Sequence, residues 1–298
     1  MTISIISKKT LRLAVLAAIV APAMPALATP VELSNGYVRA GVSDYGTLGS
    51  NSNASPGILF DKTGTGSYGV NDFLTPGSPF EGFYVTTASG TGNGGSNNAG
   101  GANFGFTSPT SLSTTSATWS GSNSVFSIVN NYNLTTLGGQ SVIAIETFLT
   151  NITTAAINGV NFLRTLDPDP DVNAFGSHYT ENTVLSDNQA GGTGISSGQT
   201  IFIYSFDSIA HKAGVSAPWS TNPGTYLAGV NDGNGDYAIG VGFNIGDILA
   251  GQTIKLTYGY SLGATKEIAG GGNVPEPASV ALLGMGILSF AARRRKTA

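Results

Sequence analysis

Three segments in which β-branched and aromatic residues alternate with polar ones constrain the fold of this chain more than any other feature. They follow one another in the sequence and span residues 124–134, 141–150 and 156–164. Such alternation is typical of strands with one buried face, and Gly138-Gly139 between the first two segments favours a hairpin turn. Three consecutive strands with short links predict an antiparallel meander packed on a second sheet.

The rest of the body also carries strand patterns and lacks helical periodicity. Residues 31–43 indicate a first strand or hairpin with a turn at Asn35-Gly36. Further strands are expected at residues 80–87, 199–206, 226–230, 237–244 and 253–262. Turn formers dominate residues 46–79, and the Gly-rich residues 90–101 are expected to form a mobile inserted loop. The sequence therefore predicts an all-β fold, an antiparallel β-sandwich of jelly-roll-like type.

The charges of the chain are distributed unevenly. Seven of the 13 basic residues lie near the two ends, namely Lys8, Lys9, Arg12, Arg293, Arg294, Arg295 and Lys296. Of the 17 acidic residues only Glu276 lies there, so residues 29–274 keep 6 basic and 16 acidic side chains, a net charge of −10. An acidic body disfavours nucleic acid as a partner and is compatible with divalent cations and polysaccharides. The absence of Cys excludes thiol catalysis and Cys-ligated zinc.

The N-terminus has the three parts of a secretory signal peptide. Basic residues precede the apolar residues 13–20, and Ala26 and Ala28 provide small side chains at the −3 and −1 positions of a cleavage site. We expect residues 1–28 to be removed by signal peptidase. An uncleaved membrane anchor is the alternative.

The C-terminus has a similar modular arrangement. Val274-Pro275-Glu276-Pro277 is followed by an uncharged apolar run at residues 278–292 and by Arg293-Arg294-Arg295. The prolines keep the tetrapeptide extended and outside the following helix. The apolar run is shorter than the roughly 20 residues of an ordinary span, so we expect a short transmembrane helix whose basic end stays cytoplasmic. A buried amphipathic helix is the alternative.

This order of motifs resembles the PEP-CTERM sorting signal of Gram-negative bacteria. The resemblance covers about the last 25 residues and implies recognition by an exosortase-type peptidase. It predicts a signal peptide at 1–28, a secreted β-sandwich at 29–272 and a sorting signal at 273–298, which contacts the membrane only transiently. It also implies export across the inner membrane to the cell surface or extracellular matrix, and association with exopolysaccharide or biofilm.

Two acidic stretches are candidates for cation binding. In the first, prolines hold Asp167, Asp169 and Asp171 in an extended segment, and a hard cation such as Ca²⁺ would relieve the repulsion of their carboxylates. Because an extended segment cannot wrap around an ion, two of them together with a residue from another loop are expected to bind it. The alternative is a solvated turn in which Arg164 neutralises one Asp. A looser likeness to other exported PEP-CTERM-type β proteins suggests that Arg164 and Asp167 hold a corner of the sandwich together.

In the second stretch, Asp232, Asn234 and Asp236 alternate as the oxygen donors of a calcium loop do, but the terminal Glu of an EF-hand is missing. A polar hairpin turn is the alternative. Ca²⁺ is thus a conditional prediction at both stretches.

Catalytic motifs are absent from the sequence, and we expect that the chain is not an enzyme. Neither a nucleophile elbow nor a zinc-protease motif occurs. The alternative is a secreted carbohydrate-active enzyme, for which the candidates by residue type are His178, His211, Glu81, Glu146 and Glu181. Exposed aromatic residues in turn-rich regions could stack on sugars, and Tyr179, Trp219 and Tyr226 are the candidates.

Overall fold

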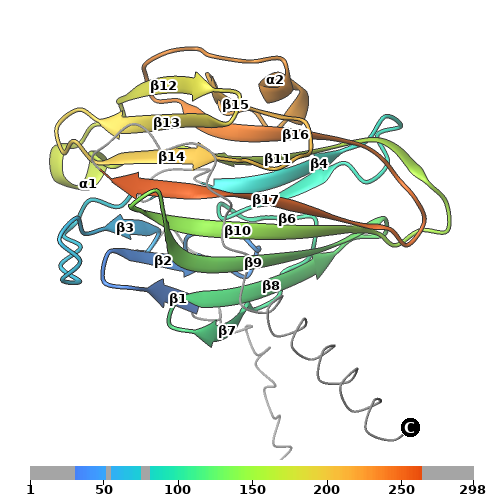
Figure 1. Cartoon of the computed structure of the whole chain (residues 1–298), viewed down its shortest axis with the longest axis horizontal. Helices are drawn as coiled ribbons and strands as arrows, with labels where there is room; N and C mark the ends of the chain where they lie inside the picture. Colours follow the sequence, from blue (N-terminus) through green and yellow to red (C-terminus); the bar gives the residue numbers. More distant parts are fainter. Residues whose placement is uncertain (1–30, 52–54, 75–80, 264–298) are drawn as a thin grey trace, which may run out of the picture.

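The computed structural model describes residues 31–51, 55–74 and 81–263. Two large antiparallel sheets face each other, and a smaller sheet of N-terminal strands lies against them (Figure 1). The antiparallel β-sandwich expected from the sequence is confirmed. The predicted signal peptide and sorting signal, with Ala26, Ala28, Val274–Pro277 and the basic tail, lie outside the described residues.

The larger sheet has eight strands in the order β12-β13-β14-β17-β10-β9-β8-β7. Their bounds are β7 Thr110–Ser113, β8 Ser116–Ser122, β9 Phe126–Leu137, β10 Gln140–Asn151, β12 Thr180–Ser186, β13 Gln189–Gly194, β14 Thr200–Tyr204 and β17 Thr253–Gly263. Strands β9 and β10 form the longest hairpin and turn at Gly138 and Gly139, both with positive φ. The predicted hairpin is therefore confirmed.

The second sheet has six strands in the order β15-β16-β11-β4-β5-β6. Their bounds are β4 Glu81–Thr86, β5 Gly94–Asn97, β6 Gly101–Ala102, β11 Ile157–Leu166, β15 His211–Ser216 and β16 Ala238–Ile248. Strand β11 lies between β4 and β16 and does not pair with β10. The prediction that residues 156–164 complete a meander with the two preceding strands is therefore wrong, since the chain crosses to the other sheet after β10.

The small sheet contains β1 Val31–Ser34, β2 Val38–Val42 and β3 Ile58–Phe60. The described part of the chain also has two short helices, α1 Val172–Phe175 and α2 Pro223–Leu227. None of the described helices is long and apolar enough to span a bilayer.

Two further expectations are wrong for local reasons. Residues 226–230 were expected to form a strand, but Asn222 caps helix α2 through Gly224 N–H and Pro223 occupies its first turn, a standard helix start. Residues 90–101 contain β5 and β6 instead of only a mobile loop. At Gly95 a Cβ atom would lie 2.1 Å from the ring of Tyr84, so glycine is required for this close strand packing.

Aromatic rings form the centre of the core between the sheets. Phe83, Phe162 and Phe243 of the six-stranded sheet are fully buried and pack on Tyr258 and Trp119 of the eight-stranded sheet. Adjacent ring centroids lie 5.8–6.2 Å apart, a normal separation for packed aromatic pairs. These rings therefore join the two sheets at the centre of the core.

A charged pair lies inside this core. Arg164 on β11 and Glu81 on β4 are both fully buried and form an ion pair. Glu81 also accepts hydrogen bonds from the Tyr260 hydroxyl at 2.8 Å and the Leu48 amide at 2.8 Å. Arg164 therefore neutralises Glu81 and not an Asp of the 167–171 stretch. The expectations that it pairs with one of these Asp residues, or holds a corner with Asp167, are wrong.

The same network fixes the segment between β2 and β3. The Gly46 carbonyl accepts hydrogen bonds from the Tyr132 hydroxyl at 2.7 Å and the Asn130 amide at 3.0 Å. A Cβ atom at Gly46 would lie 2.2 Å from the Trp119 ring, so only glycine fits there. This segment closes one part of the sandwich interior with its own backbone.

Candidate functional site

Two carboxylates lie where β11 leaves the six-stranded sheet and leads to α1, the helix at the left of Figure 1. Pro168 and Pro170 flank Asp169, whose backbone amide donates to the Phe73 carbonyl at 2.9 Å. The Asp169 side chain is only 2% exposed, and Asp167 is half-buried. Both carboxylates are therefore held on a fixed, extended backbone.

The second acidic stretch packs against this segment through the start of β12. Thr180 and Gly235 exchange backbone hydrogen bonds at 3.1 and 3.0 Å, and Asn182 N–H donates to Asn234 Oδ1 at 2.9 Å. These contacts bring Asp236 and His178 to Asp169. One potential ligand atom from each of these three residues lies within 4.8 Å of the other two.

We call Asp167, Asp169, His178 and Asp236 the Asp–His cluster. His178 Nδ1 lies 3.1 Å from Asp169 Oδ1. His178 and Asp236 are exposed, whereas Asp169 is buried, so the cluster is open to solvent on one side only. It joins residues from both acidic stretches that the sequence had indicated separately.

The electrostatics of the cluster favour the neutral forms of Asp167 and Asp169. Burial raises the pKa of Asp167 to about 7, and the charges of Asp169 and Asp236 add to this effect. Burial likewise raises the pKa of Asp169 to about 6, although His178 opposes the shift. Partial burial would lower the pKa of His178, but the contact with Asp169 and the charges of Asp236 and Asp167 outweigh it and raise the pKa.

Two oxygens of the cluster accept no hydrogen bond. They are Oδ1 of Asp167 and Oδ1 of Asp169, and both are inaccessible to solvent. His178 approaches the second oxygen as a charged partner without the geometry of a hydrogen bond. Buried carboxylate oxygens are nearly always satisfied in proteins. Asp44 Oδ1 is unsatisfied as well, so what distinguishes the cluster is that two such oxygens belong to it.

The other predicted cation ligands serve the backbone. Asp171 accepts hydrogen bonds from the amides of Ser196 at 2.7 Å and Ser197 at 3.0 Å. Asp232 accepts one from the Ala217 amide at 2.7 Å, and Asn234 binds the Asn182 amide. The structure therefore brings Asp167, Asp169 and Asp236 together. Asp171, Asp232 and Asn234 instead accept hydrogen bonds from backbone amides.

The aromatic candidates for sugar stacking differ in exposure. Tyr179 follows His178 and is 45% exposed, so it remains available. Trp219 is partly buried against Tyr84, Leu163 and Tyr226 on the outer side of the six-stranded sheet. Tyr226 is fully buried, and the expectation that it is exposed is wrong because it anchors α2.

The catalytic candidates of the enzymatic alternative do not gather in one place. Glu81 is buried in the core, and Glu146 pairs with Lys255 at 2.6 Å. His211 contacts the Ile209 carbonyl at 2.6 Å and lies against the Phe243 ring. Glu181 is exposed on β12, and of these five candidates only His178 belongs to the Asp–His cluster.

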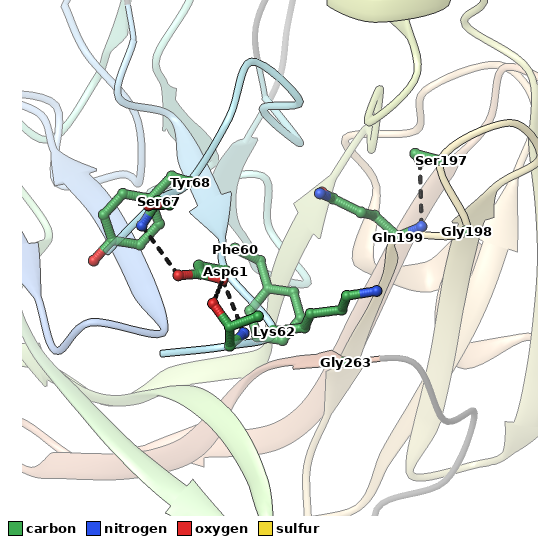
Figure 2. A pocket seen from close by; sticks show the side chains of 10 residues that line it. Phe60, Asp61, Lys62, Ser67, Tyr68, Ser197, Gly198, Gln199 and Gly263 are labelled. Atoms are coloured by element: carbon green, nitrogen blue, oxygen red, sulfur yellow. Dashed lines mark hydrogen bonds between the residues drawn. The ribbon is translucent and has the colours of Figure 1, made fainter. Parts of the chain in front are cut away.

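A surface pocket of about 290 Å³ was not indicated by the sequence. Figure 2 shows Asp61 and Lys62 on one side and Ser197 and Gln199 on the other, with Gly263 at the end of β17 below them. Asp61 accepts hydrogen bonds from Thr63, Thr65 and Ser67, and those from Thr63 contribute most to lowering its pKa. Because its oxygens serve the loop, Asp61 is a structural residue of this pocket.

Comparison with known proteins identifies the C-terminal segment. Residues 273–296 match the family model of the PEP-CTERM protein-sorting motif, which confirms the resemblance seen in the sequence. The motif marks an exported protein that is sorted through exosortase to the cell envelope or surface. A search of curated proteins found no match.

Solved structures include a similar chain. The crystal structure of a putative aldose 1-epimerase from Escherichia coli K12 has 10% sequence identity and a TM-score of 0.42, with 79% of this chain and 99% of that chain covered. A similarity at this level carries no argument about activity or ligand.

Proposed function

We propose that this chain is a noncatalytic component of the cell surface or extracellular matrix that associates with extracellular polysaccharide. The observation that carries the proposal is the PEP-CTERM motif at residues 273–296 behind a β-sandwich. The acidic body, with a net charge of −10 over residues 29–274, suits a neutral or cation-bridged polysaccharide.

The interior of the sandwich supports a noncatalytic role. Aromatic rings and the Glu81–Arg164 pair fill the space between the sheets, and the Gly46 segment closes it further. Glu81 and Glu146 are each held in an ion pair, and Glu81 has no exposed surface. These two carboxylates are therefore poor candidates for the acid and base of a glycosidase, which must both reach the substrate.

A specific observation favours the second candidate, a secreted carbohydrate-active enzyme. Asp167 and Asp169 have pKa values raised to about 7 and about 6, with Asp236 close by. Carboxyl groups with raised pKa values are typical of general acids. If the chain cleaves glycans, Asp167, which is only half-buried, would supply the proton.

One experiment separates the two functions. The purified protein is incubated with a panel of extracellular polysaccharides, and both retention of the polysaccharide and release of new reducing ends are measured. The proposal predicts retention without release, and neither result should change in Asp167→Asn or Asp169→Asn. Release of reducing ends that is abolished in either variant would establish the enzyme instead, and failure to retain any polysaccharide would refute the proposed association.

A further inference from the structure

Two buried carboxylate oxygens of the Asp–His cluster accept no hydrogen bond and could bind a cation. Removing an ionised carboxylate from water without a hydrogen bond or ion partner costs several kcal/mol. Asp169 is 2% exposed, and its Oδ1 accepts no hydrogen bond and has only His178 Nδ1, 3.1 Å away, as a charged partner. Oδ1 of the half-buried Asp167 also accepts no hydrogen bond. The nearest basic group, His178, is half-exposed. The site therefore has acceptor capacity that the described residues leave unused.

The potential ligand atoms of the cluster lie close together. Ligand atoms of Asp169, His178 and Asp236 lie within 4.8 Å of one another, and Asp167 lies close enough to Asp169 and Asp236 to feel both charges. The ligands of a tetrahedral ion with bonds of about 2.1 Å are roughly 3.4 Å apart, so rotations of the exposed His178 and Asp236 side chains would bring the ligand atoms to a common ion.

The backbone holds the donors in place. The paired hydrogen bonds of Thr180 with Gly235 fix the distance between the His178 and Asp236 segments, and the Phe73 carbonyl fixes Asp169. Because the backbone of these metal-coordinating residues is already fixed, binding an ion requires less ordering of the chain. This rigidity distinguishes the cluster from a group of acidic side chains on a free surface.

From these observations we infer that the Asp–His cluster binds a divalent first-row transition metal ion, with Zn²⁺ the best match, through Asp167, Asp169, Asp236 and the imidazole of His178. Calcium prefers six to eight oxygen ligands, whereas an imidazole among few carboxylates favours zinc and its neighbours. The inference replaces the two separate calcium loops expected from the sequence with one mixed nitrogen and oxygen site. It does not depend on the proposed polysaccharide association.

The test is calorimetric titration of the purified full-length protein, freed of metal by chelator, with ZnCl₂, MnCl₂ and CaCl₂ in turn. We expect saturable binding of one Zn²⁺ per chain that a large excess of Ca²⁺ does not displace. His178→Ala and Asp169→Asn should each weaken Zn²⁺ binding by at least about tenfold.

A matched control comes from the same loop as Asp236. Asp232→Asn alters a carboxylate that contacts the Ala217 amide and does not belong to the cluster, so Zn²⁺ affinity should stay unchanged. His178 is half-exposed, so His178→Ala will fold even if Asp169→Asn does not, and circular dichroism verifies this.

Three results would overturn the inference. They are no saturable Zn²⁺ binding to the wild-type chain, tighter binding of Ca²⁺ than of Zn²⁺, and Zn²⁺ binding that His178→Ala leaves intact. If the wild-type chain binds Zn²⁺ but retains no polysaccharide, only the proposed function is contradicted.

Discussion

Arg164 and Asp167 are three residues apart at the end of β11, but the two charged groups around them are built in opposite ways. Around Arg164, the Glu81 carboxylate receives hydrogen bonds from the guanidinium, the Tyr260 hydroxyl and the Leu48 amide. Around Asp167 and Asp169, a buried oxygen of each carboxylate receives none. The first group is complete within the protein, and the second is not.

This difference indicates that the Glu81–Arg164 pair stabilises the fold, whereas the Asp–His cluster is a candidate functional site. Burial raises the pKa of Glu81, but Arg164, Tyr260 and Leu48 all favour its ionised form, so the pair is a fixed part of the core. In the Asp–His cluster, burial and neighbouring acidic charges act in the same direction and raise the pKa of Asp167 to about 7. Strongly shifted pKa values of this kind are concentrated at functional sites.

The largest effect of a substitution on stability is expected from removing Arg164, the counter-ion of Glu81. Arg164→Met leaves the Glu81 carboxylate buried without its counter-ion, which should lower the free energy of unfolding by about 3–5 kcal/mol. Chemical denaturation measures this change. Arg39→Met is the control, because Arg39 pairs with Glu32 with both side chains about 40% exposed, and it should change little. A loss of less than about 1 kcal/mol in Arg164→Met would mean that the buried pair is not integral to the fold.

The Asp–His cluster should make the free energy of unfolding depend on pH. Because burial raises the pKa of Asp167 to about 7 and of Asp169 to about 6 from 3.8, the folded chain keeps protons that the unfolded chain loses. This contribution is complete below about pH 4 and disappears as the pH rises through 6 and 7. The raised pKa of His178 acts in the same direction.

At about 1.4 kcal/mol per pKa unit, the expected loss over this range is at most about 7 kcal/mol in metal-free protein. Denaturation curves at several pH values between 4 and 8 measure it, and Asp167→Asn should remove a large part of the slope. A stability that rises over the same range would contradict the assignment of raised pKa values.

The sequence predicts the strands of this fold better than their partners. Alternating apolar residues in 124–134 and 141–150 identify β9 and β10 because such a pattern depends only on one buried face. Residues 156–164 have the same pattern, and nothing in it indicates that β11 joins the other sheet. Strand β13 contains mainly Gly, Ala and Thr, which carry little strand signal, and it was missed for that reason.

The candidate site was only half predictable for a similar reason. Asp167, Asp169 and Asp236 could be chosen by residue type and local spacing, since acidic residues in turns are visible in any sequence. Their meeting depends on the pairing of Thr180 with Gly235, 55 residues apart. Likewise, the Glu81 partner of Arg164 lies 83 residues away, and the nearby Asp residues were the wrong choice.

A smaller effect would sharpen the picture of the complete group. Tyr260→Phe removes only the hydroxyl that donates to Glu81 Oε1 at 2.8 Å and leaves Arg164 in place. Hydrogen bonds to charged groups contribute about 1.5–3 kcal/mol, so the free energy of unfolding should fall by that amount. Tyr37→Phe serves as the control because Tyr37 is 44% exposed. No loss in Tyr260→Phe would show that Arg164 and the Leu48 amide satisfy the carboxylate without the hydroxyl.

The smallest effect is expected at the Lys255–Glu146 ion pair, which is exposed to water, unlike the Arg164–Glu81 pair. Lys255 contacts Glu146 at 2.6 Å, but the two side chains are 46% and 20% exposed. Water competes for both charges and salt screens them, so Lys255→Met should change the free energy of unfolding by about 0–1 kcal/mol, and any loss should shrink as salt is added. Denaturation at low and high ionic strength measures both quantities. A loss comparable to that of Arg164→Met would show that burial is not what separates the stabilising pair on β11 from an exposed one.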